Sequence, residues 1–243
     1  KMSKRESADL IKDGYSIYVK DLKDLGYLPE AVNNWIALMG WSFDDHTEYF
    51  TLDDLIEKFS LDRLNPSPAA INFTKFDHFN GLHIRTLETA DLAHRLRPFF
   101  EAKGYSVDDS RLLKAAPIIQ ERLVTLDDAP ETCGFLFKDD VTSPPADLVA
   151  KGLTPQQSAS VARQALGILE ALPDMSVAKI EPPLRSLVEQ LSLTPGQVFS
   201  ILRSAVTGQK VSPPLFECME IVGKEKVLER LKRAVIILEE MSV

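Results

Sequence analysis

The sequence has few of the features on which metal-dependent and membrane-bound chains rely. Its 243 residues include only two cysteines, Cys133 and Cys218, which stand in none of the spacings that bind zinc. No apolar run approaches the roughly 18 residues that a membrane helix needs. The basic start is not followed by the apolar segment of a signal peptide. We therefore expect no metal site, no membrane segment, and two free, buried thiols that fit a reducing cytoplasm.

Histidine is scarce as well, and no arrangement for nucleophilic catalysis stands out. The four histidines are His46, His78, His83 and His94. His78 and His83 are five residues apart, which is not the i,i+4 spacing of a helical metal pair. We interpret all four as surface or half-buried structural residues. Neither a Ser-His-Asp arrangement nor a glycine-rich phosphate loop is present.

Positive charge is in short supply, since the formal net charge is −8. Its distribution is uneven. Residues 1–150 carry 17 basic against 26 acidic side chains, a balance of −9, whereas residues 151–243 carry 11 against 10, a balance of +1. Phosphate contact needs a few well-placed cations rather than a basic average. Any nucleic-acid-binding face is therefore expected to be local.

The residue patterns predict an all-α chain. Pro29 stands where a helix start tolerates proline, and Thr51 with Asp54 forms a helix-capping pattern. Thr154–Gln157 and Thr194–Gln197 share a stronger start signal: a capping threonine, a proline at the first helical position, and a glutamine three residues after the threonine. The C-terminal helices are predicted at Pro155–Ala171, Glu181–Leu191, Pro195–Thr207, Pro213–Val222 and Lys224–Glu240.

A few segments depart from this helical pattern. Tyr15–Val19 has the best strand pattern and leaves room for a short β hairpin near the N-terminus, while Ala70–Phe73 is a weaker candidate. Pro98 and Pro117 lie inside helical patterns and predict kinks or restarts. Asp139–Gly152 is interpreted as a linker. Three aromatic side chains are expected in the core: Trp35, Trp41 and Phe59.

Five short motifs occur in a fixed order along the chain. They are Lys1-Met2-Ser3-Lys4-Arg5, Gly26–Ala31 (GYLPEA), Gly40-Trp41-Ser42, Leu202–Gly208 (LRSAVTG) and Ser212–Leu215 (SPPL). This ordered set resembles bacterial-type glutamyl-tRNA synthetase, a class I aminoacyl-tRNA synthetase, from its KMSKS-type lysine loop to its C-terminus. The resemblance covers essentially all of the chain. A helical tail favours the bacterial or organellar class, because other glutamyl and glutaminyl enzymes use β-barrels there.

The resemblance implies the C-terminal portion of a glutamate–tRNA ligase. The whole enzyme would join glutamate to the 3′ end of tRNA-Glu with ATP and Mg²⁺ during protein biosynthesis. Its nucleotide-binding catalytic half would precede Lys1, so this portion is expected to be inactive alone, to bind no cofactor, and to hold tRNA as a cytoplasmic monomer. The implied divisions are the lysine-loop remnant (1–5), a stem-contact domain (6–85) and two helical anticodon-binding subdomains (86–140 and 141–243).

The same resemblance carries over to individual site residues. Lys1 and Lys4 match the catalytic lysine loop, and Lys4 matches the lysine that contacts ATP, where an ammonium group stabilises charge developing on the phosphate. Ser212, Pro213 and Leu215 match positions that contact the middle and third anticodon bases. Arg203 precedes them with a planar guanidinium suited to a base edge or a phosphate. Unstacked anticodon bases can be recognised by such groups.

Gln120 leads to a hypothesis about tRNA selection. It aligns with a position where some members place an arginine that recognises the third anticodon base. Glutamine is a weaker and more permissive partner than arginine, so the parent enzyme would charge both tRNA-Glu and tRNA-Gln. Arg122 is an alternative residue for the same contact.

Two other function classes stay open at the level of sequence. One is a free-standing RNA-binding helical module without ligase activity. The other is a helical interaction scaffold, whose acidic charge would favour protein partners. Binding to a tRNA-Glu transcript across a salt series separates them, because phosphate contact predicts an affinity that falls steeply with salt.

Overall fold

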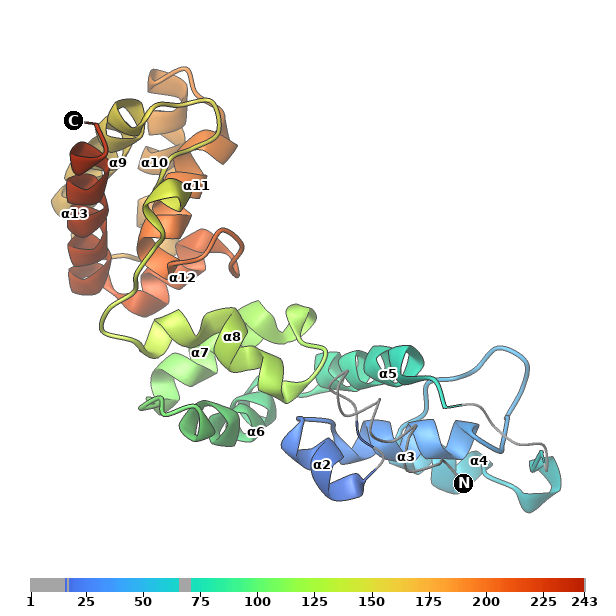
Figure 1. The fold of residues 1–243 in the computed structure, drawn as a ribbon. Coiled ribbons are helices and arrows are strands. Elements are labelled where there is room, and N and C mark those ends of the chain that lie inside the picture. The colour runs from blue at the N-terminus through green and yellow to red at the C-terminus, as the bar shows by residue number, and fades with distance from the viewer. Residues whose placement is uncertain (1–15, 17, 66–70, 243) are drawn as a thin grey trace. The chain divides into compact units, whose positions relative to one another are not determined.

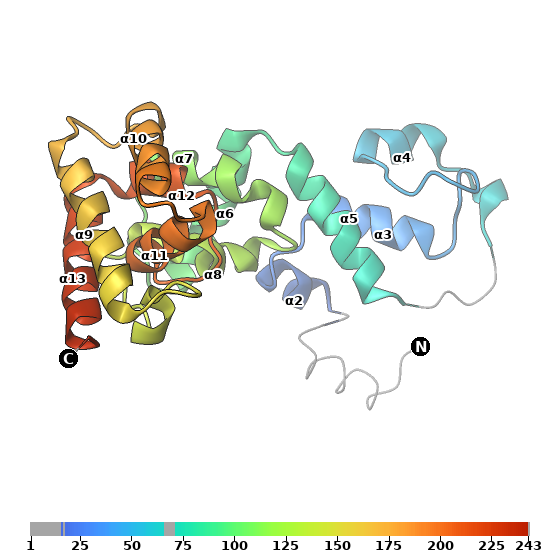
Figure 2. The same ribbon diagram turned by 90° about the horizontal axis from the view of Figure 1, so that it is seen from above.

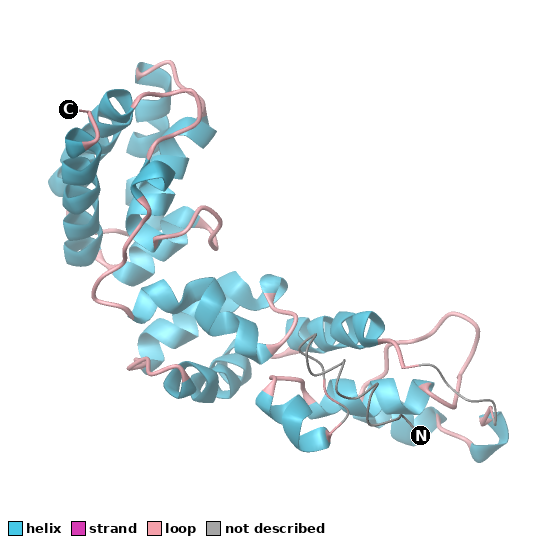
Figure 3. Cartoon of the chain, viewed as in Figure 1, coloured by secondary structure: helices cyan, strands magenta, loops and turns pink. Residues whose placement is uncertain are grey.

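The computed structural model describes residues 16, 18–65 and 71–242. Within these ranges the chain forms α-helices, α2 to α13, joined by turns and short 3₁₀ segments, and it contains no β-strand (Figures 1 and 3). Strand-like pairing in the described part is limited to one isolated bridge between Trp41 and Leu64. The prediction of an all-α chain is confirmed.

The sequence left room for a β hairpin near the N-terminus. For the residues that the structure describes, this expectation is wrong. Val19 begins helix α2 (Val19–Asp24), while Tyr15 lies outside the described residues. Ser16 explains the difference, because its hydroxyl donates to Asp21 (2.7 Å) and accepts from the Tyr18 N–H (3.1 Å). These short-range bonds favour a helix start over an extended strand. Phe73, in the weaker strand candidate, likewise begins a helix.

The chain divides into two compact units. Unit 1 comprises residues 1–103 and 119–131, and unit 2 comprises residues 104–118 and 132–243. Neither unit is a single continuous stretch of sequence. The divisions implied by the family resemblance, after residues 85 and 140, fall at different places and stay predictions.

Unit 1 is built around the packing of α3 (Pro29–Leu38) against α5 (Phe73–Thr86). Phe76, fully buried on α5, stacks against Tyr27 and Trp35 with ring centroids 4.2 Å away in both cases. A second cluster joins Trp41, Phe50 and Leu55. The remaining helices are α2, α4 (Leu52–Lys58) and α6 (Thr89–Ala102). Helix α6 continues across Pro98, so this proline does not end its helix. The same holds for Pro117 in α7 (Asp109–Ile119), which belongs to unit 2 apart from Ile119.

Phe59 corrects the expected core list. Trp35 and Trp41 are buried as predicted, but the Phe59 side chain is 44% exposed and only lies against the Trp41 ring at 5.5 Å. Thr51 and Asp54 form the expected capping box at the start of α4. At the other end Phe59 has extended backbone angles (φ −67°, ψ 130°). It therefore leaves the helical register that places Leu55 in the core.

His83 is also more deeply buried than the sequence indicated. Its Nε2 lies 3.3 Å from Asn34 Oδ1, and its ring packs against Tyr49 at 4.6 Å. Asn34 Oδ1 also accepts from the Phe50 N–H at 3.0 Å. Burial lowers the pKa of His83 from its ordinary value, and the nearby Glu30 carboxylate opposes this shift only in part. The neutral imidazole is therefore the form that suits the folded state.

A pH dependence of stability follows from His83. Because its folded-state pKa is depressed, the unfolded chain binds a proton more readily below about pH 6.5. Stability contributed by the neutral ring is present above that pH and is lost as the pH falls. Thermal unfolding between pH 7 and pH 5 should show a steeper decline for the wild type than for His83→Gln. The matched variant His46→Gln, at an exposed position, should keep the wild-type slope. An equally steep decline in His83→Gln would contradict this assignment.

Unit 2 consists mainly of a helical bundle in which α9 and α13 lie side by side (Figures 1 and 2). Its threonine caps form as predicted: Thr154 accepts from the Gln157 N–H at 3.2 Å and Thr194 from the Gln197 N–H at 3.3 Å. The helices of the bundle are α9 (Pro155–Ala171), α10 (Val177–Gln190), α11 (Pro195–Thr207), α12 (Leu215–Val222) and α13 (Lys224–Glu240). The short α8 (Ala129–Cys133) precedes them in the sequence and is divided between the two units after residue 131.

Helix α10 starts four residues before the predicted Glu181 and contains Pro182 and Pro183. Its first N–H, from Val177, donates to the Glu220 carboxylate of α12 at 2.8 Å. A carboxylate at a helix N-terminus satisfies an otherwise unpaired donor and interacts favourably with the helix dipole. This tertiary contact stabilises the helix start at Val177, which the two prolines inside α10 disfavour.

The segment interpreted as a linker, Asp139–Gly152, is instead part of the unit 2 core. It forms a 3₁₀ turn at Pro145–Leu148 that packs against α11 and α13, and Ser143, Leu148 and Ala150 are buried. Its polar, proline-rich start resembles a linker in composition, but Leu148 and Ala150 are anchored by burial.

The expected free thiols of Cys133 and Cys218 are confirmed as buried, and burial raises the pKa of Cys133.

Candidate nucleic-acid interface

The candidate site is the connection between α11 and α12, residues 208–214, called here the α11–α12 loop. Gly208 ends α11 in the left-handed conformation (φ 73°), where a side chain would be strained and its Cβ would lie 3.3 Å from the Thr142 carbonyl oxygen. Helix α12 begins at Leu215, two residues after the predicted Pro213. Ser212 and Pro213 each precede a proline, which disfavours the helical conformation, and their carbonyls accept bonds from a side chain of α11.

That side chain is Arg203. Its Nη1 donates to the Pro213 carbonyl at 2.9 Å, to the Ser212 carbonyl at 3.3 Å, and to the Ser212 hydroxyl. One guanidinium therefore holds two consecutive loop residues and fixes the path of the chain. The structure brings together four residues that the sequence selected, and three of them form this hydrogen-bonded group. The fourth, Leu215, begins α12 directly behind it.

The exposed edge of the loop consists of other residues. Ser212, Pro213 and Leu215 are buried, whereas Lys210 and Pro214 are exposed and the Val211 side chain is 76% exposed. Lys210 pairs with Asp147 at 2.7 Å. Sequence reasoning did not select this exposed edge, because a motif identifies positions without distinguishing which of them point inward.

Arg185 on α10 was also missed. Its guanidinium carbon lies 5.9 Å from the centroid of the Phe216 ring and 6.0 Å from that of Phe199, and these two rings meet edge to face at 5.3 Å. The side chain is exposed and its Nε donates to Glu181 at 2.7 Å. Arg185 thus presents a planar cation beside the start of α12. No local motif marks it, because its aromatic partners come from other helices.

Gln120 and Arg122 lie in unit 1, on the short 3₁₀ turn Gln120–Arg122. Gln120 Nε2 donates to the carbonyls of Ile84 (2.9 Å) and Leu87 (2.8 Å), so its amide group satisfies the C-terminal end of α5. Its amide oxygen is the group left to act as an acceptor. Arg122 is exposed.

The predicted catalytic lysines, Lys1 and Lys4, lie outside the described residues. In the ranges that the structure does describe, no group of three His, Cys, Asp or Glu side chains could hold a metal ion. Nor is any described helix both long and apolar enough to cross a membrane.

Comparison with known proteins assigns this chain to a family. A family described as "Anticodon binding domain" matches residues 91–235, and the family "tRNA synthetases class I (E and Q), catalytic domain" matches residues 1–78. The chain belongs to the glutamyl-tRNA synthetase family. The α11–α12 loop and Arg185 both fall inside the part matched as anticodon binding domain.

Individual relatives agree with this assignment. The glutamate–tRNA ligase of Dehalococcoides mccartyi (strain ATCC BAA-2100) is 42% identical over 226 residues, which cover 91% of this chain and 46% of that protein. The ligase of Chloroflexus aurantiacus is 38% identical, covering 100% of this chain and 48% of its own length. The chain thus spans about half the length of the curated relatives it matches.

Solved structures support the fold. A crystal structure of a glutamate tRNA ligase from Elizabethkingia meningosepticum, in complex with its amino acid, superposes with a TM-score of 0.83. The match covers 97% of this chain and 48% of that one at 22% sequence identity. Glutamate-tRNA synthetase from Elizabethkingia anophelis gives a TM-score of 0.80. At such identities the likeness concerns the fold alone, which is the helical fold described above.

Proposed function

We propose that this chain is the tRNA-binding part of a glutamate–tRNA ligase and that the α11–α12 loop contacts the anticodon of tRNA-Glu. The observation that carries the proposal is the loop held by Arg203, inside the region matched by the anticodon-binding family. Val211 offers an exposed apolar surface, and Lys210 and Arg185 offer cations. Unstacked bases bind to such planar guanidinium and apolar surfaces.

The wider assignment is part of the same proposal. In the whole ligase, glutamate would be activated with ATP and Mg²⁺, and Lys1 and Lys4 would belong to the loop that contacts the ATP phosphates. Residues 6–85 would contact the inner corner of the tRNA, and residues 86–140 and 141–243 would form the anticodon-binding region. The protein would act as a monomer in the cytoplasm.

Selection between tRNA-Glu and tRNA-Gln is proposed to depend on the Gln120–Arg122 turn. The Gln120 Nε2 group donates to the carbonyls at the end of α5, so the amide oxygen is the atom that can act as an acceptor. An arginine would instead present several N–H donors in one plane. The geometry therefore favours a permissive contact to the third anticodon base. Arg122 is the alternative residue for this contact.

The test is binding of the 243-residue chain to unmodified tRNA-Glu transcript. Affinity should fall linearly with salt on logarithmic axes, and nuclease footprinting should show protection of the anticodon loop. Arg185→Ala should weaken binding about tenfold, as expected for a stacked base contact of 1–3 kcal/mol. The matched variant Arg163→Ala, on the exposed face of α9, should not. A tRNA-Gln transcript as second ligand tests the permissive contact.

Footprints that leave the anticodon loop unprotected would refute the proposed loop contact. Binding without salt dependence would instead favour a protein-interaction scaffold. Equal protection of tRNA-Glu and tRNA-Gln supports permissive selection, and rejection of tRNA-Gln rules it out.

A further inference from the structure

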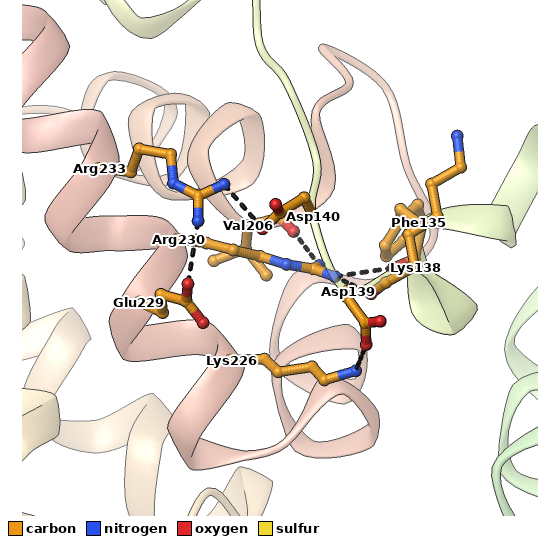
Figure 4. Close-up of polar contacts among 9 residues, drawn as sticks. All are labelled: Phe135, Lys138, Asp139, Asp140, Val206, Lys226, Glu229, Arg230 and Arg233. Carbon is orange, nitrogen blue, oxygen red and sulfur yellow. Dashed lines mark hydrogen bonds and ion pairs between the residues drawn. The ribbon is translucent and has the colours of Figure 1, made fainter.

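Arg230 on α13 is a buried cation with an unusual set of partners. Its side chain is only 3% exposed. Nη1 donates to the Val206 carbonyl at 2.6 Å, while Nη2 donates to the carbonyls of Lys138 (2.7 Å) and Phe135 (3.1 Å) (Figure 4). These acceptors are neutral main-chain groups from segments 24 to 95 residues away. A charge buried in this way needs compensation from its surroundings.

The compensation comes from the ends of helices and from the nearby carboxylates of Asp140 and Glu229. Val206 lies in the last turn of α11, Phe135 lies within the short 3₁₀ helix Gly134–Phe137, and Lys138 directly follows that helix. The last carbonyls of a helix lack partners within it and carry partial negative charge. Burial lowers the pKa of Arg230 to about 10, so the guanidinium stays charged at neutral pH. It joins two helix ends that would otherwise be unsatisfied.

The neighbouring carboxylates belong to other cations. Arg233 donates to Asp140 at 2.7 Å and to Glu229 at 2.9 Å, and Lys226 binds Asp139 at 2.6 Å (Figure 4). Lys226, Arg230 and Arg233 lie about one turn apart on α13. These three side chains bind residues 135–140 to α13, and Arg230 is the buried one among them.

The last turn of α11 receives hydrogen bonds from three side chains. Arg230 donates to Val206, the Ser143 hydroxyl donates to the Ser204 carbonyl, and the Thr207 hydroxyl donates to the Arg203 carbonyl at 2.7 Å. This turn carries Arg203, whose guanidinium fixes Ser212 and Pro213. A displacement of the turn would therefore displace the loop.

We propose that Arg230 is a positioning residue for anticodon discrimination: it fixes the last turn of α11 through Val206 and thereby sets where Arg203 holds the α11–α12 loop. This inference rests on the proposed function, since it concerns the same loop. Arg230 contacts no RNA itself, because it is buried. Its influence passes through the helix end, and a precise support of this kind determines how well a binding site is preorganised.

The conservative variant Arg230→Lys tests the role of the guanidinium. Lysine keeps the charge and most of the aliphatic stem, but its single ammonium cannot serve three carbonyls in a fixed plane. Arg163→Lys is the matched control, because it makes the same exchange at an exposed residue of α9 that pairs with Glu239. Both variants are compared with the wild-type chain for thermal unfolding and for binding to two transcripts. One transcript is tRNA-Glu and the other differs from it only at the middle anticodon base, because the proposed permissive contact concerns the third base.

We expect Arg230→Lys to bind tRNA-Glu about tenfold more weakly, within the range of coupling between neighbouring sites. Its affinity for the changed transcript and its salt dependence should stay at the wild-type values, since the number of phosphate contacts is the same. A merely structural role would lower both affinities together through the folded fraction. Arg163→Lys should match the wild type.

Folded Arg230→Lys with wild-type discrimination would overturn the inference. If Arg230→Lys does not fold, Ser143→Ala decides, because it removes the hydroxyl that donates to the Ser204 carbonyl in the same turn and leaves the α11–α12 loop itself unaltered. Reduced discrimination in Ser143→Ala supports the inference and unchanged discrimination overturns it. A wild-type chain that does not discriminate between the two transcripts refutes the proposed function itself, and the inference with it.

Discussion

Replacing Phe76 by alanine is expected to lower the free energy of unfolding of unit 1 by about 3–5 kcal/mol. Phe76 is fully buried, and its ring stacks between Tyr27 and Trp35 at 4.2 Å from each. The substitution removes buried apolar surface, leaves a cavity, and ends both stacking contacts. A loss of this size is a large fraction of the stability of a typical domain.

Phe59→Ala is the matched control for this experiment. It makes the same chemical change at a side chain that is 44% exposed, so we expect a loss of less than about 1 kcal/mol. Urea unfolding followed by tryptophan fluorescence suits the comparison, because Trp35 and Trp41 both lie in unit 1. Equal midpoints for the two variants would contradict the stacked core described here.

Replacing Arg203 by alanine is expected to weaken binding to tRNA-Glu by about 30- to 100-fold, the scale of a hot-spot arginine. The variant removes the donor to the Ser212 and Pro213 carbonyls, which lie in the candidate anticodon-contacting loop. The loop would lose its fixed path, and the exposed Val211 and Lys210 would lose their positions with it. Leaving buried acceptors without donors should also cost about 1–3 kcal/mol of stability.

Two measurements separate loop geometry from charge in the Arg203 experiment. Arg203→Lys keeps the positive charge, so it should recover the salt dependence of binding but only part of the affinity. Arg163→Ala removes an exposed arginine of the same unit and should bind as the wild type does. Wild-type affinity in folded Arg203→Ala would show that the loop does not contact the tRNA.

The features that sequence predicted correctly depend on short-range contacts. The caps at Thr154 and Thr194 involve residues three positions apart, and the bounds of α9, α11 and α13 follow from them and from Gly208 and Gly223. Both residues of each cap lie within one helical turn. The cap can therefore be predicted without knowing which helices pack together.

The features that sequence did not predict depend on partners far along the chain. Helix α10 begins early because Glu220, 43 residues away, accepts its first N–H. Segment 139–152 has the composition of a linker, but Leu148 packs in the core of unit 2. The sequence predicts Arg203 as an anticodon contact, but a guanidinium serves equally well as a base contact or as an internal support. In the structure Arg203 donates to the Ser212 and Pro213 carbonyls and so supports the loop.

The discontinuity of unit 1 has a consequence for the order in which the chain can fold as it is made. The Leu126 N–H donates to the Gly26 carbonyl at 3.0 Å, and Asn80 donates to the Val124 carbonyl at 2.6 Å. The hydrogen-bond partners of Gly26 and Asn80 are therefore synthesised 100 and 44 residues later, respectively. Nascent chains that end near residue 103 should be sensitive to protease, and protection should appear only once residue 131 has left the exit tunnel.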